Sequence, residues 1–308
     1  MPKTLYRGRF APSPTGPLHF GSLIAAVGSY LQARSNHGEW WLRIEDIDPP
    51  REPKGTSDNI IRTLELYGFE WHGPVQYQHN QLEHYAEVVN ELIKTQRLYH
   101  CSCSRKQISQ QSHHRHGPLI YPGTCRSKVC QTESLQPHQM TALRINTHDV
   151  EVTFNDAIQG NQNIHLEQHG DYVIQRADGH YSYQLAVAVD DAEHGMTEVV
   201  RGADLLGCTA RQIYLQQLLN LPTPKYAHLP IAKDPNGQKL SKQTFAQAID
   251  KSKPSLLLWY ALTFLGQQPE RALIEGKLDE LWQWAIEHWK FKLVPKSADT
   301  DKDIYKVC

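Results

Sequence analysis

The apolar residues of this chain fall into short runs that suit strands and longer stretches spaced like one face of a helix. Residues 4–10 predict a short strand, and the apolar positions within 23–31 predict a helix soon after it. The prolines and the glycine within 12–17 exclude regular structure between the two. Residues 40–44 and 197–200 predict two further strands. These patterns indicate an α/β protein.

Near the C-terminal end the pattern predicts helices alone. One is expected over Ser255–Leu265 and a second, rich in tryptophan, over Leu278–Trp289. The longest apolar run, Leu256–Leu262, is too short to span a bilayer and is typical of a core helix. We therefore expect a small helical tail that packs on the rest of the chain.

Length and charge narrow the class of protein. The 308 residues suffice for about two domains with a sizeable core. Lys and Arg total 32 against 33 Asp and Glu, a net charge of −1, so any surface for nucleic acid must be a local one. Neither a signal peptide nor a membrane-spanning run is seen in the sequence. We expect a cytoplasmic monomer without a membrane partner.

One candidate for phosphate chemistry lies between the first strand and the first helix. His19 stands just before the predicted helix, and Gly21 follows where the backbone must approach a neighbour closely. Helix N-termini offer unpaired N–H groups and a positive dipole end, so an anion can bind there. The alternative is an ordinary proline-rich loop with a surface histidine.

A second candidate lies 220 positions after His19. The run Lys239–Gln243 carries two lysines around Ser241 and follows a turn-forming segment, residues 234–238. A loop with two lysines can neutralise the charge of a triphosphate, and the alternative is a solvated basic turn. Together, His19 and Lys242 predict a protein that opens ATP at its α-phosphate.

Four of the six cysteines fall within thirty residues. They are Cys101, Cys103, Cys125 and Cys130. Without a signal peptide, such clustering indicates a metal site rather than disulfides. The fourth ligand stays open at this point, because His113, His114 and His116 are also suitable. Four protein ligands would make the site structural, and the alternative is a set of free buried thiols.

Four motifs resemble those of class I aminoacyl-tRNA synthetases, in the order of that family. They are residues 12–16 with 18–21, residues 43–48, residues 189–191 with 200–204, and residues 239–243. The glutamyl and glutaminyl branch is the most similar, over residues 5–245. Ser22 replaces the second histidine of the first motif, and Gln243 replaces the last serine of the fourth. Both changes keep the leading histidine of the first motif and the second lysine of the fourth, so activation of an amino acid by ATP should survive.

The candidate amino-acid site follows from charge and from this resemblance. Glutamate carries two carboxylates and one ammonium, which call for guanidinium groups and a carboxylate. Arg9, Glu45 and Arg201 stand at the ends of predicted strands, where ligands gather in open α/β sheets. Taken singly, they are typical of surface salt bridges, and Tyr183 is typical of a core aromatic.

The resemblance implies a role for each residue of the site. It implies a glutamate site of Arg9, Phe10, Ala11, Pro12, Ser13, Glu45, Tyr183 and Arg201. It implies ATP contacts from His19, Gly21, Ser22 and Lys242, with His19, Lys242 and Lys239 as catalytic residues and Mg²⁺ arriving with ATP. It also implies one structural Zn²⁺ on Cys101, Cys103, Tyr121 and Cys125, because related short members use Cys-x-Cys followed by Tyr-x-x-x-Cys. Cys130, which would complete a four-cysteine site by spacing, is kept in reserve.

The expected architecture is a doubly wound, Rossmann-type parallel sheet interrupted by a zinc-bearing insertion. The expected segments are 1–97 and 148–245 for the two halves of the catalytic core, 98–147 for the insertion and 246–308 for the helical tail. Because only 65 residues follow Gln243, we expect no anticodon-binding domain.

The chain thus resembles truncated paralogues of glutamyl-tRNA synthetase. Members of that family transfer glutamate from the adenylate to the queuosine base at the wobble position of tRNA(Asp), and activate glutamate without tRNA. The alternatives are an ordinary synthetase for tRNA(Glu), a silent tRNA- or zinc-binding paralogue, and a small-molecule nucleotidylyltransferase.

Overall fold

The computed structural model describes residues 5–111, 120–127, 141–232 and 247–297. A first parallel sheet has the order β1 (Arg7–Phe10), β2 (Glu39–Ile44) and β3 (Gln76–Tyr77). A second sheet has the order β7 (Gly160–His165), β6 (Glu151–Asp156), β10 (Lys225–Leu229) and β9 (Glu198–Gly202). Strand β10 runs parallel to both its neighbours, and only β7 is antiparallel to its partner. The strands expected near residues 7, 40 and 198 are confirmed.

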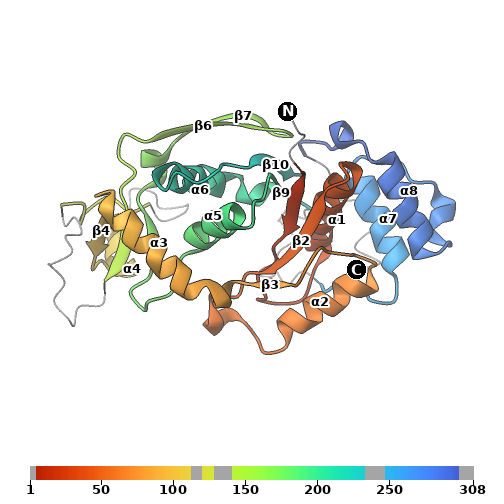
Figure 1. Ribbon diagram of the computed structural model, residues 1–308, viewed down its shortest axis with the longest axis horizontal. Coiled ribbons are helices and arrows are strands. Elements are labelled where there is room, and N and C mark those ends of the chain that lie inside the picture. The colour runs from red at the N-terminus through yellow and green to blue at the C-terminus, as the bar shows by residue number, and fades with distance from the viewer. Residues whose placement is uncertain (1–4, 112–119, 128–140, 233–246, 298–308) are drawn as a thin grey trace.

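The two sheets meet where β1 lies beside β9. The N–H of Thr197 donates to the carbonyl of Arg7 at 2.9 Å, and the N–H of Arg7 donates to Thr197 Oγ1 at 2.8 Å. Helix α1 (Phe20–Ser35) crosses this junction and packs against strands of both sheets. Figure 1 shows α1 on one side of the strands and α5 (Tyr183–Glu193) with α6 (Leu206–Leu218) on the other. The helices therefore cover both faces, as expected for a doubly wound fold.

Helix α1 approaches β10 closely at a glycine. A Cβ added to Gly28 would lie 2.6 Å from Leu229 Cδ1, so a larger residue would push the helix away from the sheet. The residues of α1 that face the strands are almost all buried.

A small antiparallel sheet lies at one end of the molecule. Helix α2 (Thr56–Leu66) connects β2 to β3 within the first sheet, and helix α3 (Leu82–Lys94) leads from β3 to the small sheet. Its strands are β4 (Leu98–Cys101), β5 (Ala142–Ile145) and β8 (Tyr172–Gln175), and helix α4 (Arg105–Gln111) follows β4. Because β8 completes this sheet, the sheet reaches past residue 147, where the sequence analysis placed the end of the insertion. Residue spacing alone could not show which later strand pairs with β5.

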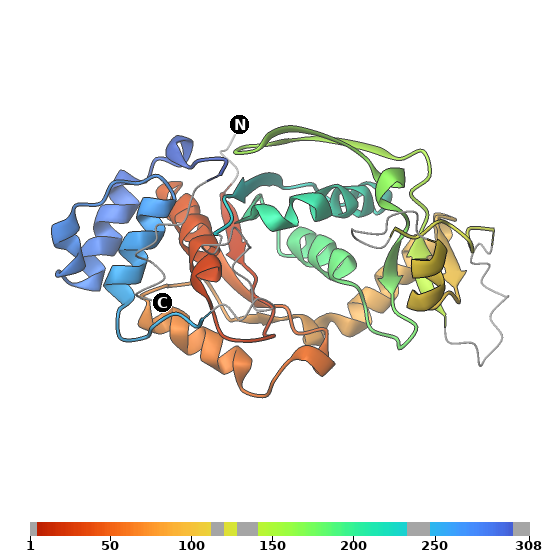
Figure 2. The same cartoon turned by 180° about the vertical axis from the view of Figure 1, so that it is seen from behind.

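Two helices form the opposite end of the molecule, as Figures 1 and 2 show. Helix α7 (Pro254–Phe264) and helix α8 (Leu278–His288) pack on α1 and confirm both helices expected near the C-terminal end. Trp282 of α8 stacks edge-on against Tyr30 and Phe69, and its Nε1 donates to the Tyr67 carbonyl at 2.8 Å. These helices therefore share one core with the first sheet.

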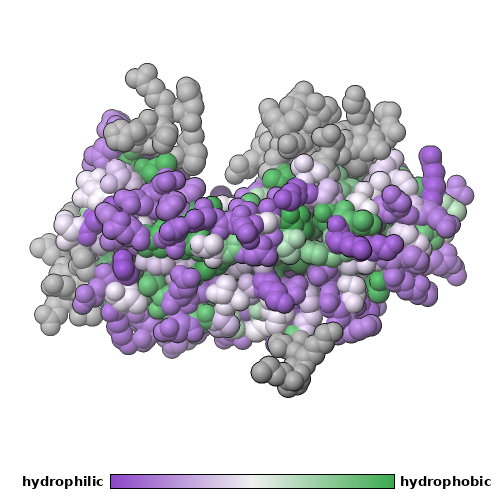
Figure 3. Space-filling model, turned by 90° about the horizontal axis from the view of Figure 1, so that it is seen from above, coloured by the Kyte–Doolittle hydropathy of each residue, from purple (hydrophilic) through white to green (hydrophobic). Residues whose placement is uncertain are grey.

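The face seen in Figure 3 is mostly hydrophilic, with hydrophobic side chains gathered in smaller areas between the polar ones. Within the described ranges, no helix is both long and apolar enough to cross a membrane.

Candidate active site

One cavity of about 490 Å³ lies at the carboxyl ends of β1, β2, β9 and β10, beside the start of α1. We call it the strand-end cavity. Its lining includes eleven residues that the sequence analysis assigned to glutamate or ATP. They are Arg9, Phe10, Ala11, Pro12, Ser13, His19, Gly21, Ser22, Glu45, Tyr183 and Arg201. These residues come from four separate segments, and the parallel strands bring them together as open α/β sheets do.

One wall of this cavity is formed by the first turn of α1. His19 is the N-cap residue, and its Nδ1 accepts a hydrogen bond from the N–H of Ser22 at 3.2 Å. In a neutral ring the proton then resides on Nε2, which can donate to an anion. Gly21 is the second residue of α1 and lines the cavity without a side chain. Lys239 and Lys242 lie outside the described residues.

Behind the wall that Arg9 and Glu45 line lies a buried network of five charged groups: Arg9, Arg43, Glu45, Asp190 and Asp191. Arg9 binds Asp191 through two bonds of 3.0 and 3.1 Å, and Arg43 binds Asp191 at 2.8 Å. Arg43 also lies 3.6 Å from Asp190 and 3.4 Å from Glu45. With all groups ionised, three carboxylates face two guanidinium groups. In that state the network carries one excess negative charge, which an ammonium group can neutralise.

The pKa of Glu45 and the pKa of Asp191 are shifted in opposite directions. Burial raises the pKa of Glu45 to about 7, although Arg43 and Arg9 oppose this shift. Burial also acts on Asp191, but Arg9 and Arg43 hold the pKa of that carboxyl well below its usual range. Asp191 is thus a permanent anion that fixes the two arginines. Glu45, which lines the cavity, changes its charge near neutral pH.

Arg201 is held by a second buried network on the opposite wall. Its Nε donates to His228 Nε2 at 3.1 Å, and its Nη2 donates to Thr209 Oγ1 at 2.8 Å and to Gln212 Oε1 at 2.7 Å. Nη1 is buried and has no hydrogen-bond partner among the described residues. The guanidinium is therefore fixed in place, with the N–H donors of Nη1 left to bind a carboxylate.

His228 is the link between Arg201 and the rest of the sheet. Its Nδ1 lies 2.5 Å from Asp156 Oδ2, and both side chains are fully buried. Burial lowers the pKa of His228, and the neutral ring must carry its proton on Nδ1 because Nε2 accepts from Arg201. Asp156 thus selects the tautomer that orients Arg201.

The sequence analysis assigned no role to these supporting residues. Arg43 interrupts an apolar strand, and Asp190 with Asp191 ends an apolar stretch of α5. Charged residues at otherwise buried positions were the available signal, because such charges must be paired. No charged residue within an apolar segment pointed to His228 or Asp156 in this way. These two residues meet only through the pairing of β6 with β10.

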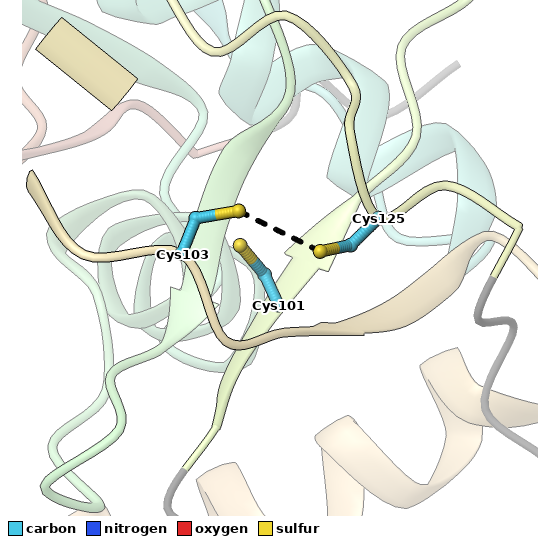
Figure 4. A group of neighbouring side chains, drawn as sticks. All are labelled: Cys101, Cys103 and Cys125. Atoms are coloured by element: carbon cyan, nitrogen blue, oxygen red, sulfur yellow. Dashed lines mark hydrogen bonds between the residues drawn. The ribbon is translucent and has the colours of Figure 1, made fainter. Parts of the chain in front are cut away.

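A cluster of cysteines lies beside the small sheet, at the end of β4 (Figure 4). The sulfurs of Cys101, Cys103 and Cys125 lie within 4.8 Å of one another, and those of Cys103 and Cys125 are 3.6 Å apart. Tyr121 points its hydroxyl at the cluster, 3.8 Å from Cys103 Sγ. Cys130 and the three candidate histidines lie outside the described residues.

This donor set fits a tetrahedral zinc ion. Zinc binds cysteine sulfur at about 2.3 Å, so two sulfurs of a tetrahedral site are separated by about 3.8 Å. The distance of 3.6 Å between Cys103 and Cys125 agrees with that value. The Tyr121 hydroxyl, which already accepts from the Cys125 N–H at 2.9 Å, can supply an oxygen to the fourth position.

The protein combines a parallel sheet, a helix N-terminus that can bind an anion and a charged cavity at the strand ends. This combination is typical of nucleotide-dependent α/β enzymes. Residues 6–271 match the family described as tRNA synthetases class I (E and Q), catalytic domain. The chain belongs to this family, which confirms the resemblance found in the sequence.

Named relatives and solved structures agree with that membership. The chain is 51% identical over 296 residues to the glutamyl-Q tRNA(Asp) synthetase of Dechloromonas aromatica, covering 95% of this chain and 97% of the relative. It is 48% identical over 297 residues to the protein of the same name from Aromatoleum aromaticum, covering 96% and 92%. The glutamate-tRNA synthetase structure from Elizabethkingia anophelis superposes with a TM-score of 0.79 at 25% identity, covering 97% of this chain and 68% of the other.

Proposed function

We propose that this protein activates glutamate with ATP and transfers the glutamyl group to the queuosine base of tRNA(Asp). The observation that carries the first half is the strand-end cavity, where the N-terminus of α1, two fixed arginines and one buried carboxyl surround the same space. The second half is supported by the relatives named glutamyl-Q tRNA(Asp) synthetase, which match this chain over nearly its whole length.

Glutamate is held by complementary charge. Its ammonium neutralises the excess negative charge of the Arg9, Arg43, Asp190, Asp191 and Glu45 network, with Glu45 as the group that lines the cavity. Arg201 offers Nη1 to one carboxylate, and Tyr183 lines the wall between Arg201 and Glu45. Neutral glutamine would leave Arg201 without a charged partner, so selection against glutamine can reach about 10⁴-fold.

In the first step an oxygen of the glutamate α-carboxylate attacks the α-phosphorus of ATP, and pyrophosphate leaves with its electron pair. Positioning and charge neutralisation supply most of the rate enhancement in such phosphoryl chemistry. His19 donates from Nε2 to the phosphate, and Lys242 with Lys239 neutralises the charge that develops. Mg²⁺ arrives bound to ATP.

In the second step a hydroxyl oxygen of the acceptor attacks the carbonyl carbon of the glutamyl-adenylate. An ester bond forms, the bond between that carbon and the phosphate oxygen breaks, and AMP leaves with the electron pair. The hydroxyl proton passes to the departing phosphate. No side-chain intermediate is needed, so the protein acts by holding the two substrates in line.

Two assays separate this function from the alternatives. Exchange of labelled pyrophosphate into ATP with glutamate and without tRNA tests activation, and its absence would favour a silent paralogue. Incubation with ATP, labelled glutamate and tRNA with or without queuosine tests transfer. We expect label only on queuosine-containing tRNA(Asp). Label on tRNA(Glu) would instead indicate an ordinary synthetase.

We also propose that Cys101, Cys103, Tyr121 and Cys125 hold one structural zinc ion. Four protein ligands leave no open position, so the ion would stabilise the small sheet and take no part in the reaction. Metal analysis should find about one zinc per chain, absent from Cys125→Ser and bound more weakly by Tyr121→Phe. Cys208→Ser is the matched control, because Cys208 is a free cysteine outside the cluster. Full zinc in Tyr121→Phe would reject the tyrosine and favour Cys130.

A further inference from the structure

We propose that a second cavity beside the strand-end cavity binds the acceptor nucleotide, with the cyclopentene ring of queuosine inside and a phosphate at the rim. This inference rests on the proposed function. The adjoining cavity has a volume of about 310 Å³. It shares the wall residues Ser13, Thr15, Glu45 and Tyr183 with the strand-end cavity. A hydroxyl held there would lie next to the activated glutamate.

A buried polar group without a partner belongs to a residue that lines the adjoining cavity. Gln78 lines it, is only 1% exposed, and donates from Nε2 to Asp190 at 2.7 Å. That bond fixes the side-chain amide, yet its Oε1 is buried and has no partner among the described residues. Buried acceptors are nearly always satisfied in folded proteins, so this oxygen calls for a donor from a ligand.

A carboxylate lies in the same interior. Glu52 lines the cavity, and one of its oxygens accepts the N–H of Asp48 at 2.8 Å, which fixes the side chain. Queuosine carries two ring hydroxyls and a secondary amine that is protonated near neutral pH. These donors match Glu52 and the Gln78 oxygen, whereas the ribose at a tRNA 3′ end offers hydroxyls without the positive charge.

The rim of the adjoining cavity carries two exposed arginines. Arg51 donates from Nε to Asp48 Oδ2 at 2.5 Å, and Arg176 donates from Nη1 to Asp48 Oδ1 at 3.2 Å and from Nη2 to Asp178 Oδ2 at 2.5 Å. Their side chains are 69% and 44% exposed. One carboxylate thus holds two guanidinium groups, from segments far apart in the sequence, at the same opening. Such a pair is suited to bind a phosphate of the RNA backbone.

Two variants test the rim and the interior separately. Arg51→Ala with Arg176→Ala should lower kcat/KM for transfer to queuosine-containing tRNA(Asp) at least tenfold. It should also flatten the dependence of log KM on log salt by about 0.7 for each single-strand phosphate that the arginines no longer neutralise. Glu52→Gln should lower transfer at least tenfold, because the neutral amide cannot accept a charged hydrogen bond in the same way. Tenfold is about 1.4 kcal/mol.

Glutamate-dependent pyrophosphate exchange is the internal control, because none of these three residues lines the strand-end cavity. We expect it to stay within twofold of wild type. Arg62→Ala, an exposed arginine of α2 outside the adjoining cavity, is the matched control for charge removal and should leave transfer unchanged.

Three results would overturn the inference. In the two test variants, transfer to the tRNA could fall no further than in Arg62→Ala. In the double arginine variant, the salt dependence of KM could stay as in wild type. In either test variant, pyrophosphate exchange could fall as much as transfer. A wild-type enzyme that exchanges pyrophosphate but leaves queuosine unmodified would instead overturn the proposed function, and with it the acceptor named here.

Discussion

Replacing Asp156 by asparagine tests how the fold positions the arginine of the glutamate site. Oδ1 of Asp156 accepts the N–H groups of Ile158, Gln159 and His228 at 2.8 to 3.1 Å, and asparagine can keep its oxygen there. Its amide nitrogen then faces His228 Nδ1, where the carboxylate oxygen Oδ2 was. The ring must move its proton to Nε2, so that it presents a donor to the Nε–H donor of Arg201.

The size of the effect follows from the hydrogen bond that Arg201 can no longer make. Hydrogen bonds to a charged group contribute about 1.5–3 kcal/mol, and a buried charged donor without an acceptor costs a similar amount. Since 1.4 kcal/mol is a factor of about ten, Asp156→Asn should raise the KM for glutamate about 10- to 100-fold. The KM for ATP should change less than twofold, because Arg201 has no assigned contact with the nucleotide.

The assay is pyrophosphate exchange at varied glutamate and at varied ATP. Asp171→Asn is the matched control: Asp171 is buried and holds Arg126 and Thr147 in the small sheet. Both variants should lose thermal stability, but only Asp156→Asn should change the KM for glutamate. If both variants lose stability alike and neither changes that KM, the tautomer argument is wrong.

Three further predictions follow from other parts of the structure. Glu45 is protonated below its raised pKa of about 7, so the KM for glutamate should fall as pH rises through 7. Glu45→Gln should raise the KM for glutamate and abolish this pH dependence. An unchanged pH profile in the variant would reject the contact between Glu45 and the ammonium group. Lys242→Ala should lower the rate of pyrophosphate exchange about 10²–10³-fold, and a fall below tenfold would remove Lys242 from the catalytic step. Trp282→Ala should reduce the free energy of unfolding by about 3–5 kcal/mol, because the ring fills the core between Tyr30 and Phe69. The KM for glutamate and the KM for ATP should not change. Calorimetry measures the stability, and pyrophosphate exchange measures the two KM values.

The sequence predicted the strands and helices around the strand-end cavity better than the buried residues that hold its charged side chains in place. The strands at β1, β2 and β9 and both C-terminal helices were foreseen because their apolar spacing is local information. The residues assigned from the motifs, such as Arg9 and Glu45, lie in one cavity because strand ends meet at one edge of a parallel sheet.

Contacts across the sheets could not be foreseen in the same way. His228 reaches Arg201 and Asp156 only because β10 lies between β9 and β6, which depends on strand order rather than on residue spacing. The pairing of β5 with β8 likewise placed the edge of the small sheet beyond residue 147. Long-range pairing is thus the part of this fold that local patterns did not specify.

The proposal that glutamate is transferred to a base within the tRNA is tested most directly by the nucleoside that carries it. The protein should be incubated with ATP, glutamate and queuosine-containing tRNA(Asp), and the tRNA digested to nucleosides for mass spectrometry. We predict that the mass of one glutamyl group is added to queuosine and that the 3′-terminal adenosine is unmodified. Glutamate found on the terminal adenosine, with queuosine unchanged, would contradict the account.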